Sequence, residues 1–200
     1  MTEKAQEKVY LIKPLTKEHW QDFEALFGDK GAYGGCWCMF WRMKRSEFMK
    51  SSGEERKQGM QALVNSGTVP GLLLYEDGKP IGWCSVGPRE QFYPLERSKT
   101  LLRVDDQPVW SLVCFYIDRK FRKHGVMTLL IQSAIDFVKA QGGQIIEAYP
   151  TDMQSAKLGG KNLTGYHGFM GIASAFRKAG FVEVGRANDI QLIMRYKILE

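Results

Sequence analysis

The chain has 200 residues, 44% of them hydrophobic and 25% charged, and carries a net charge of +6 at pH 7. These values are typical of a soluble globular protein, so we expect a single domain over residues 1–200. No stretch approaches the roughly 18 apolar residues that a membrane-spanning helix needs, and the polar start of the chain lacks the apolar segment of a secretory signal. We therefore expect a cytoplasmic protein with no membrane partner.

The first third predicts one strand and two helices. Residues 9–13 read as a short strand. Thr16 is placed to cap a helix whose apolar positions recur at helical spacing, namely Trp20, Phe23, Leu26 and Phe27. A glycine-rich loop covers residues 28–35, and Ser52 and Glu55 have the spacing of a capping box that opens a second helix.

The middle of the chain predicts a hairpin and a third strand. Residues 71–75 and 81–86 are apolar runs that flank Asp77-Gly78, a typical hairpin turn. Residues 87–107 are polar and predict a long loop, and residues 109–117 form an apolar strand.

The last third alternates helices and strands. We expect helices over residues 126–140 and 172–179, and strands over residues 144–149, 181–185 and 190–198. The element order is β-α-α-β-β-β-α-β-α-β-β, which predicts a mixed α/β layer fold.

A basic loop joins the apolar strand of residues 109–117 to the helix that follows it. The loop runs Arg119-Lys120-Phe121-Arg122-Lys123-His124-Gly125, and Val126 opens the helix. Backbone N–H groups at a helix start lack partners within the helix and lie at the positive end of its dipole. Cations beside them, and a glycine that allows close approach, predict a site for a pyrophosphate.

Two motifs in this order resemble the GNAT superfamily of acyl-CoA-dependent N-acetyltransferases, and residues 34–42 look like a bacterial branch of it. The first motif, Arg/Gln-x-x-Gly-x-Gly/Ala, is matched by residues 122–127, with Met127 in place of the small last residue. The second, an aromatic residue and a lysine before Gly-Phe, is matched by residues 176–181. The resemblance covers residues 70–200 well and implies a GNAT fold: a mixed, largely antiparallel central sheet flanked by helices.

The resemblance also implies acetyl-CoA as co-substrate and a small amine as acceptor. The pantetheine arm would pair with the strand at Phe115, Tyr116 and Ile117, and an N–H near Cys114 or Phe115 would polarise the thioester. The pyrophosphate would bind at the helix start, at Arg122, Lys123, His124, Gly125, Val126, Met127 and Thr128. Family members are often dimers, so a homodimer is one assembly that the resemblance allows.

An alkyl amine with a pKa near ~10 must lose a proton before it attacks, so a general base is expected. Glu147 is the leading candidate, Tyr149 shares its strand face, and His167 and Glu90 are weaker alternatives. The family's usual tyrosine acid falls on Phe176, which cannot donate a proton. Either Tyr149 or Tyr166 substitutes for it, or no acid is needed, because a thiolate with a parent pKa near ~8.5 leaves readily.

The resemblance to the GNAT superfamily implies that the segment after the first helix borders the acceptor site. We expect Trp37, Trp41 and Phe92 to bind the substrate, and with Arg42 nearby they suit an amine that has an apolar or aromatic body or carries a carboxylate. Cys36 and Cys38 could serve in packing, in metal binding or in redox sensing. No further ligands complete a zinc site, so no metal is expected; disulfides are not expected either.

Two other functions fit the same sequence. A GNAT-fold module could hold CoA without catalysis, as Phe176 hints. A basic protein could bind nucleic acid with strong salt dependence, although no recognised nucleic-acid motif is present, so nucleic acid is not the expected partner.

Overall fold

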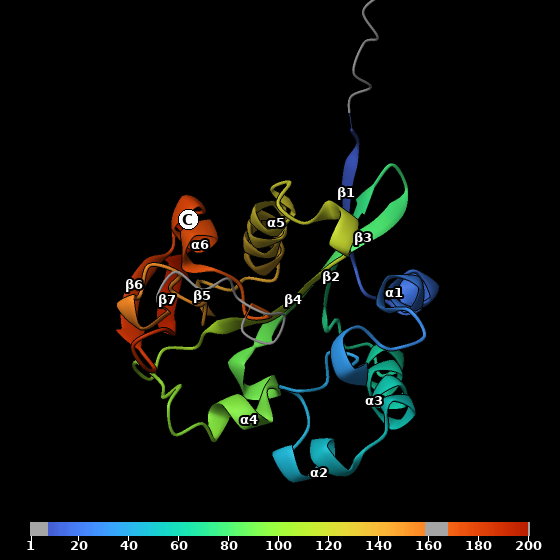
Figure 1. The fold of residues 1–200 in the computed structure, drawn as a ribbon, viewed down its shortest axis with the longest axis horizontal. Helices are drawn as coiled ribbons and strands as arrows, with labels where there is room; N and C mark the ends of the chain where they lie inside the picture. The colour runs from blue at the N-terminus through green and yellow to red at the C-terminus, as the bar shows by residue number, and fades with distance from the viewer. Residues whose placement is uncertain (1–7, 159–167, 200) are drawn as a thin grey trace, which may run out of the picture.

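The computed structural model describes residues 8–158 and 168–199. Its centre is a seven-stranded sheet in the order β1-β2-β3-β4-β5-β7-β6, with helices on both faces (Figure 1). β4 and β5 are parallel, and all other neighbouring strands are antiparallel. The predicted largely antiparallel sheet flanked by helices is therefore confirmed.

The N-terminal half follows the sequence prediction closely. It contains β1 (Tyr10–Pro14), α1 (Trp20–Phe27), α3 (Gly53–Asn65), β2 (Gly71–Glu76) and β3 (Lys79–Pro88). The capping box of α3 forms, because the Glu55 N–H donates to Ser52 Oγ at 3.2 Å and the Ser52 N–H donates to Glu55 Oε2 at 2.6 Å. The predicted cap at Thr16 is wrong: a 3-10 turn, η1 (Lys17–His19), precedes α1, and the Thr16 hydroxyl makes no capping bond.

Several short elements lie where no helix was predicted. These are η2 (Tyr33–Gly35), α2 (Arg45–Lys50), η3 (Arg89–Gln91) and α4 (Tyr93–Glu96). Each is too short to carry a helical hydrophobic period, so the sequence holds little signal for it.

The C-terminal half contains the remaining predicted elements, which are β4 (Trp110–Ile117), α5 (Val126–Ala140), β5 (Ile145–Ala148), α6 (Ala173–Lys178), β6 (Val182–Arg186) and β7 (Leu192–Lys197). Two 3-10 turns that were not predicted, η4 (Arg119–Phe121) and η5 (Ala156–Leu158), lie between them. Among the described residues, no helix is both long enough and apolar enough to cross a bilayer.

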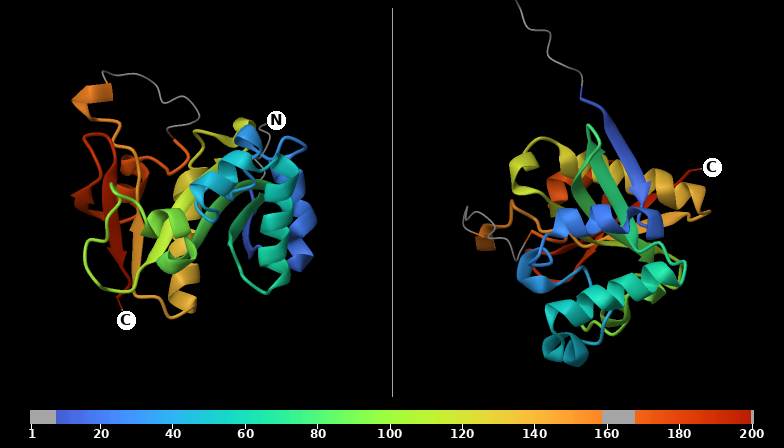
Figure 2. Two further views of the ribbon diagram at one scale, coloured as in Figure 1. Left: turned by 90° about the horizontal axis from the view of Figure 1, so that it is seen from below. Right: turned by 90° about the vertical axis from the view of Figure 1, so that its right-hand side faces the viewer.

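Helices cover both faces of the sheet (Figure 2), and the buried apolar side chains form three clusters. Leu72 and Leu74 pack in the layer covered by α5 and α6. Their neighbours Leu73 and Tyr75 pack in the layer covered by α1 and α3. This alternation places the two helical layers on opposite sides, as the two-residue period of a strand requires.

A β-bulge in β4 changes which side chains face which layer. Ser85 pairs with Cys114 and Val86 pairs with Leu112, so Val113 is an extra residue on β4. Leu112 and Phe115 therefore share the α5 layer, while Cys114 packs against the opposite layer. Bulges re-aim side chains in this way and recur next to active sites.

Candidate active site

The parallel seam between β4 and β5 is short. Their pairing covers only Trp110–Leu112 against Ile146–Ala148. Past this point the Phe115 N–H donates to the carbonyl oxygen of Phe169 at 2.6 Å. The segment around Phe169 thus meets β4 where the seam ends, at the position predicted for pantetheine pairing.

The basic loop has the predicted strand–loop–helix geometry. Gly125 has φ 81° at the N-cap of α5, and its missing Cβ would meet no protein atom within 4 Å. Lys123 also has a positive φ, 66°. The first turn of α5 holds the N–H groups of Val126 and Met127, which have no acceptor within an α-helix. The backbone is therefore open toward solvent where an anion would approach.

The side chains of this loop divide into two groups. Arg122, Lys123 and His124 are exposed, whereas Val126 is buried in the core and Met127 is half-buried against it. Two of the predicted contacts are already used: the Thr128 N–H donates to Gly125 O at 2.9 Å, and Arg122 Nε donates to Ile117 O at 3.0 Å. The N–H groups of Val126 and Met127 and the exposed side chains of Lys123 and His124 remain available for a pyrophosphate.

An apolar pocket lies on the α1 side of β4, and we call it the aromatic pocket. It encloses about 180 Å³. None of the described residues along its wall is acidic, basic or histidine. The wall is formed by Phe27, Ala32, Tyr33, Gly34, Cys36, Cys38, Phe40, Trp41, Phe48, Cys114, Phe115, Tyr116 and Phe169.

The predicted acceptor residues fall in different places. Trp41 lines the aromatic pocket, and its indole N–H is buried with no hydrogen-bond partner in the described part of the chain. Trp37 is instead buried in the layer under α1, stacked on Phe27 at 5.7 Å between ring centroids. Phe92 is fully buried, with the Arg42 guanidinium 4.6 Å from its ring centroid.

Three thiols contribute to the same wall: Cys36, Cys38 and Cys114. If extended, the chain would place Cys36 and Cys38 on one face, but it turns at Trp37 and Cys38, where φ is 43° and 58°. Burial raises the pKa of Cys36 to about 11. The hydrogen bond from the Cys114 thiol, helped by Trp83 and Arg42 and opposed by burial, lowers the pKa of Cys38 below the ordinary 9.0.

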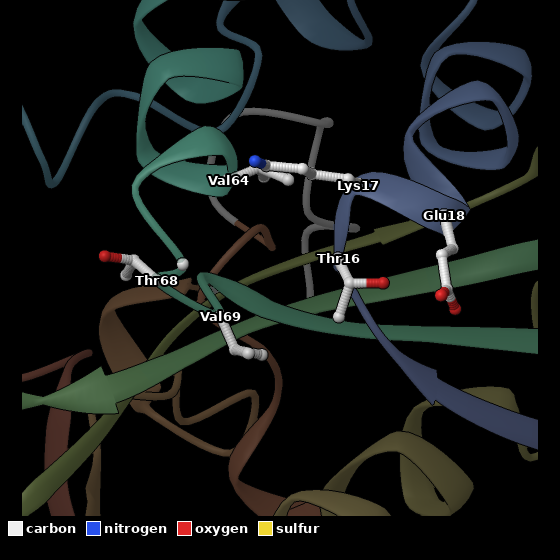
Figure 3. A pocket seen from close by; sticks show the side chains of 7 residues that line it. Thr16, Lys17, Glu18, Val64, Thr68 and Val69 are labelled. Atoms are coloured by element: carbon white, nitrogen blue, oxygen red, sulfur yellow. The ribbon is translucent and has the colours of Figure 1, made fainter.

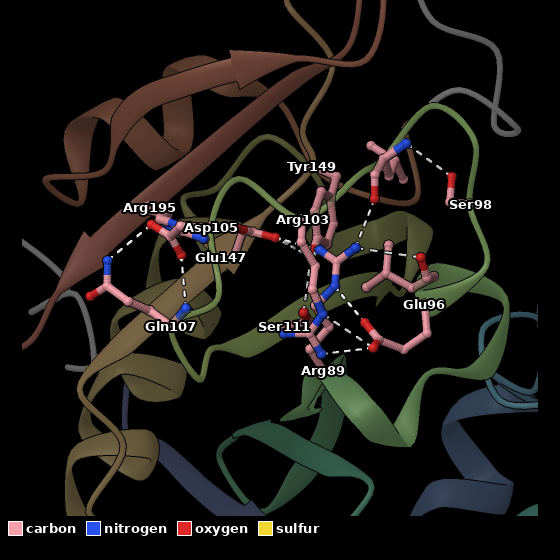
Figure 4. A network of polar contacts seen from close by, with 12 residues as sticks. Arg89, Glu96, Ser98, Arg103, Asp105, Gln107, Ser111, Glu147, Tyr149 and Arg195 are labelled. Atoms are coloured by element: carbon pink, nitrogen blue, oxygen red, sulfur yellow. Dashed lines mark hydrogen bonds and ion pairs between the residues drawn. The ribbon is translucent and has the colours of Figure 1, made fainter.

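Glu147 and Tyr149 belong to a buried polar network rather than to the aromatic pocket (Figure 4). Glu147 is fully buried: Oε1 accepts from Arg89 Nη1 at 2.6 Å and Oε2 accepts from Arg195 Nε at 2.7 Å. The Tyr149 hydroxyl donates to Glu147 Oε1 at 2.7 Å and lies 2.9 Å from Ser111 Oγ. Burial raises the pKa of Tyr149 well above 10.0.

This network ties the long loop after β3 to the sheet. Arg89 also donates to Glu96, and Arg195 donates to Asp105 at 2.6 Å, so both guanidinium groups join the loop to strands. Both carboxylate oxygens of Glu147 accept from guanidinium groups, so Glu147 stabilises the contact between the loop and the sheet. These contacts do not favour Glu147 as the general base.

None of the other acid–base candidates is found in the described wall of the aromatic pocket. Glu90 is on the surface in an ion pair with Arg103. His167 and Tyr166 lie outside the described residues. Phe176 is fully buried against Phe115 and Phe181, so its position serves packing.

A second, more open cavity of about 310 Å³ lies between the start of η1 and the end of α3 (Figure 3). It is lined by Thr16, Lys17, Glu18, Val64, Gly67, Thr68 and Val69. It shares none of these residues with the aromatic pocket, and none was predicted as a site residue.

A family model described as the acetyltransferase (GNAT) family matches residues 35–159, more than half of the chain. The chain belongs to the GNAT acetyltransferase family. It is therefore an acyltransferase by family. A comparison with curated proteins finds no match.

Solved structures show the same fold at low sequence identity. A Streptococcus pneumoniae GNAT-family acetyltransferase is 14% identical with a TM-score of 0.51, covering 96% of this chain and 100% of that one. A Brucella melitensis ribosomal-protein-alanine N-acetyltransferase is 18% identical with a TM-score of 0.51 and coverages of 94% and 99%. A Thermoplasma acidophilum PaiA N-acetyltransferase in complex with coenzyme A is 13% identical with a TM-score of 0.52 and coverages of 95% and 99%.

Proposed function

We propose that this GNAT protein transfers an acetyl group from acetyl-CoA to a primary amine with an aromatic or apolar body. The observation that carries the proposal is that the aromatic pocket and the open end of the β4–β5 seam share Phe115 and Phe169. A thioester at the seam would therefore face an acceptor held in the pocket. The cytoplasm, where acetyl-CoA is available, is its proposed location.

The chain's own groups suit the binding of CoA. The open first turn of α5 and the exposed Lys123 and His124 would hold the pyrophosphate. The pantetheine arm would replace the Phe169 carbonyl as partner of the Phe115 N–H. A PaiA neighbour with coenzyme A bound supports this ligand class.

The chemistry of the pocket favours an amine that is neutral at pH 7. No described wall residue is a carboxylate that could hold an ammonium group, and none is a histidine or carboxylate that could remove its proton. An aryl amine is already neutral, so its nitrogen lone pair is free to attack.

Release of free CoA thiol tests the proposal. The full chain is mixed with acetyl-CoA and one amine at a time: an aniline, a phenylalkyl amine, a polyamine and buffer alone. We expect release with the aniline to exceed release with the polyamine by more than 10-fold. CoA binding in calorimetry without thiol release for any amine would instead support a catalytically inactive CoA-binding module.

A further inference from the structure

Phe40 lies at the centre of a cluster of rings in the wall of the aromatic pocket. Its ring meets three other wall rings edge-on, at centroid distances of 5.1 Å to Trp41, 5.4 Å to Phe48 and 5.9 Å to Phe169. Edge-to-face contacts are a preferred geometry of aromatic pairs, so the four rings support one another. They offer flat apolar surfaces that suit an aromatic ligand.

The size of the aromatic pocket limits this ligand. Its volume of about 180 Å³ is below the roughly 300 Å³ at which pockets for drug-sized ligands begin. A single aromatic ring with small substituents is the largest ligand that we expect the pocket to enclose.

Two arginines stack on rings of the same wall. The guanidinium carbon of Arg45 lies 4.9 Å from the ring centroid of Phe40, and that of Arg56 lies 4.3 Å from the ring centroid of Phe48. No described carboxylate is within ion-pair distance of either guanidinium group. The one acidic residue of α2 is instead paired with Lys44. Both arginines therefore keep an uncompensated positive charge beside the pocket.

Arg42 adds a third cation behind the wall. Its Nη2 donates to Ser85 Oγ at 3.3 Å and to Pro70 O at 2.8 Å, and its buried Nε has no partner in the described part of the chain. Ser85 pairs across the sheet with Cys114, which lines the pocket. Side chains of such a pair lie next to each other, so Arg42 is one side chain away from the wall.

These three cations face a wall without acids. Charges act more strongly in apolar surroundings than in water, and a cleft flanked by charges of one sign concentrates ligands of the opposite sign. The aromatic pocket therefore favours a ligand that combines an apolar ring with an anionic group.

We propose that the acceptor is an aromatic amine that carries a carboxylate, and that Arg45 binds this carboxylate. The inference rests on the proposed acetyl transfer to an aryl amine and names the class of that amine. The ring would lie in the aromatic pocket, and the carboxylate would extend to Arg45 beside Phe40.

The hydrogen bonds of the arginines identify Arg45 as the carboxylate ligand. The Arg45 side chain is exposed, and no described residue accepts a hydrogen bond from its guanidinium group. A free guanidinium can bind a carboxylate through two parallel hydrogen bonds. In Arg56, by contrast, all three nitrogens already donate, to Ser51, Gly34 and Gly35. Arg56 thus supports the loop and contributes charge only.

A pair of acceptors that differ in charge tests the proposal. para-Aminobenzoate and para-aminobenzamide share the ring, the amine and nearly the same shape, and both substituents withdraw electrons from the ring. At saturating acetyl-CoA, the KM of the wild type should be at least about 10-fold lower for the benzoate than for the benzamide. Added sodium chloride should reduce this preference, because it screens the charges.

Variants of α2 assign the preference to one residue. Arg45→Gln should raise the KM for para-aminobenzoate at least about 10-fold and leave the KM for para-aminobenzamide unchanged. Arg45→Lys keeps the charge without the planar fork and should restore only part of the preference. Lys50→Gln removes the same charge from an exposed lysine at the end of α2 that stacks on no described wall ring, and it should retain the full preference.

Calorimetry without acetyl-CoA measures the same preference in the absence of any reaction. The full chain should bind para-aminobenzoate more tightly than para-aminobenzamide, and Arg45→Gln should abolish the difference. Urea denaturation of Arg45→Gln and Lys50→Gln checks that both variants fold like the wild type.

The outcomes separate this inference from the proposed function. Thiol release with equal KM values for the two acceptors, or equal losses in Arg45→Gln and Lys50→Gln, overturns the carboxylate site and leaves acetyl transfer to an aryl amine in place. Tighter binding of para-aminobenzoate that depends on Arg45, without thiol release, supports the carboxylate site and counts against the proposed function. Calorimetric binding of neither compound overturns the site.

Discussion

The Phe115 N–H and the Phe169 carbonyl oxygen are joined by a hydrogen bond of 2.6 Å that links β4 to the segment before α6. This bond uses the strand group that a pantetheine arm would need. In the proposed mode of binding, CoA would therefore exchange one backbone partner for another, at little net cost in hydrogen bonding.

The first prediction concerns this exchange. On titration with CoA, the amide resonance of Phe115 should move by more than that of Leu73, which lies in β2 on the other side of β3. Two-dimensional ¹H–¹⁵N NMR measures both. Saturation by CoA with an unmoved Phe115 amide would show that the arm binds elsewhere.

The second prediction concerns charge at the start of α5. Lys123→Gln should weaken CoA binding about two- to five-fold, as expected for an exposed cation worth roughly 0.5–1 kcal/mol, and should reduce its salt dependence. Lys139→Gln changes an exposed lysine in the last turn of the same helix and is the control. Equal losses in the two variants would contradict a pyrophosphate site at Lys123.

The third prediction separates the two tryptophans. Trp41→Ala should raise the KM for an aromatic amine about 10-fold and leave the KM for acetyl-CoA unchanged, because Trp41 lines the aromatic pocket. Trp37→Ala should instead lower the free energy of unfolding by about 3–5 kcal/mol, since it empties a packed core position. Steady-state kinetics and urea denaturation distinguish them, and an unfolding loss as large in Trp41→Ala would reject its role as a pocket wall.

The fourth prediction concerns Glu147. Glu147→Gln should destabilise the fold by about 3–5 kcal/mol, because it leaves Arg89 and Arg195 buried without their shared carboxylate. Glu90→Gln breaks an exposed pair with Arg103 and should cost less than about 1 kcal/mol. If Glu147→Gln stayed fully folded and lost kcat, Glu147 would be the general base after all.

The fifth prediction concerns acid stability. The hydrogen bond from Arg195 lowers the pKa of Asp105 from 3.8 to about 2. A lowered folded-state pKa gives stability that is present above pH 3.8 and is lost as the pH falls toward 2. The difference in Tm between wild type and Asp105→Asn should therefore shrink from pH 5 to pH 2, and a constant difference would show that the ion pair contributes nothing.

The sequence predicted the fold because its signals are local. The apolar runs of residues 71–75 and 81–86, the turn at Asp77 and Gly78 and the capping box at Ser52 each depend on neighbours within a few residues. The basic loop and Gly125 were predicted for the same reason.

The site was harder to predict because its contacts are distant in sequence. The bulge at Val113 moves Cys114 to the layer under α1, and it leaves no pattern in the strand's composition. Glu147 was predicted as the general base because nothing in the sequence indicates that it pairs with Arg89 and Arg195. These two residues lie 58 and 48 positions away in the chain. Trp37 and Phe92 read as acceptor walls, yet tertiary packing buries both.

The short seam between β4 and β5 also has a consequence for how the chain assembles during synthesis. β1 to β4 lie in the sheet in chain order and pair as antiparallel neighbours, so each can join as it leaves the ribosome. β7 lies between β5 and β6, so the second half of the sheet must wait for the last strand of the chain. Among the described residues, the β4–β5 ladder that joins the two halves has only three residue pairs. The edge of β4 beside Phe115 is therefore among the last parts of the nascent protein to be covered.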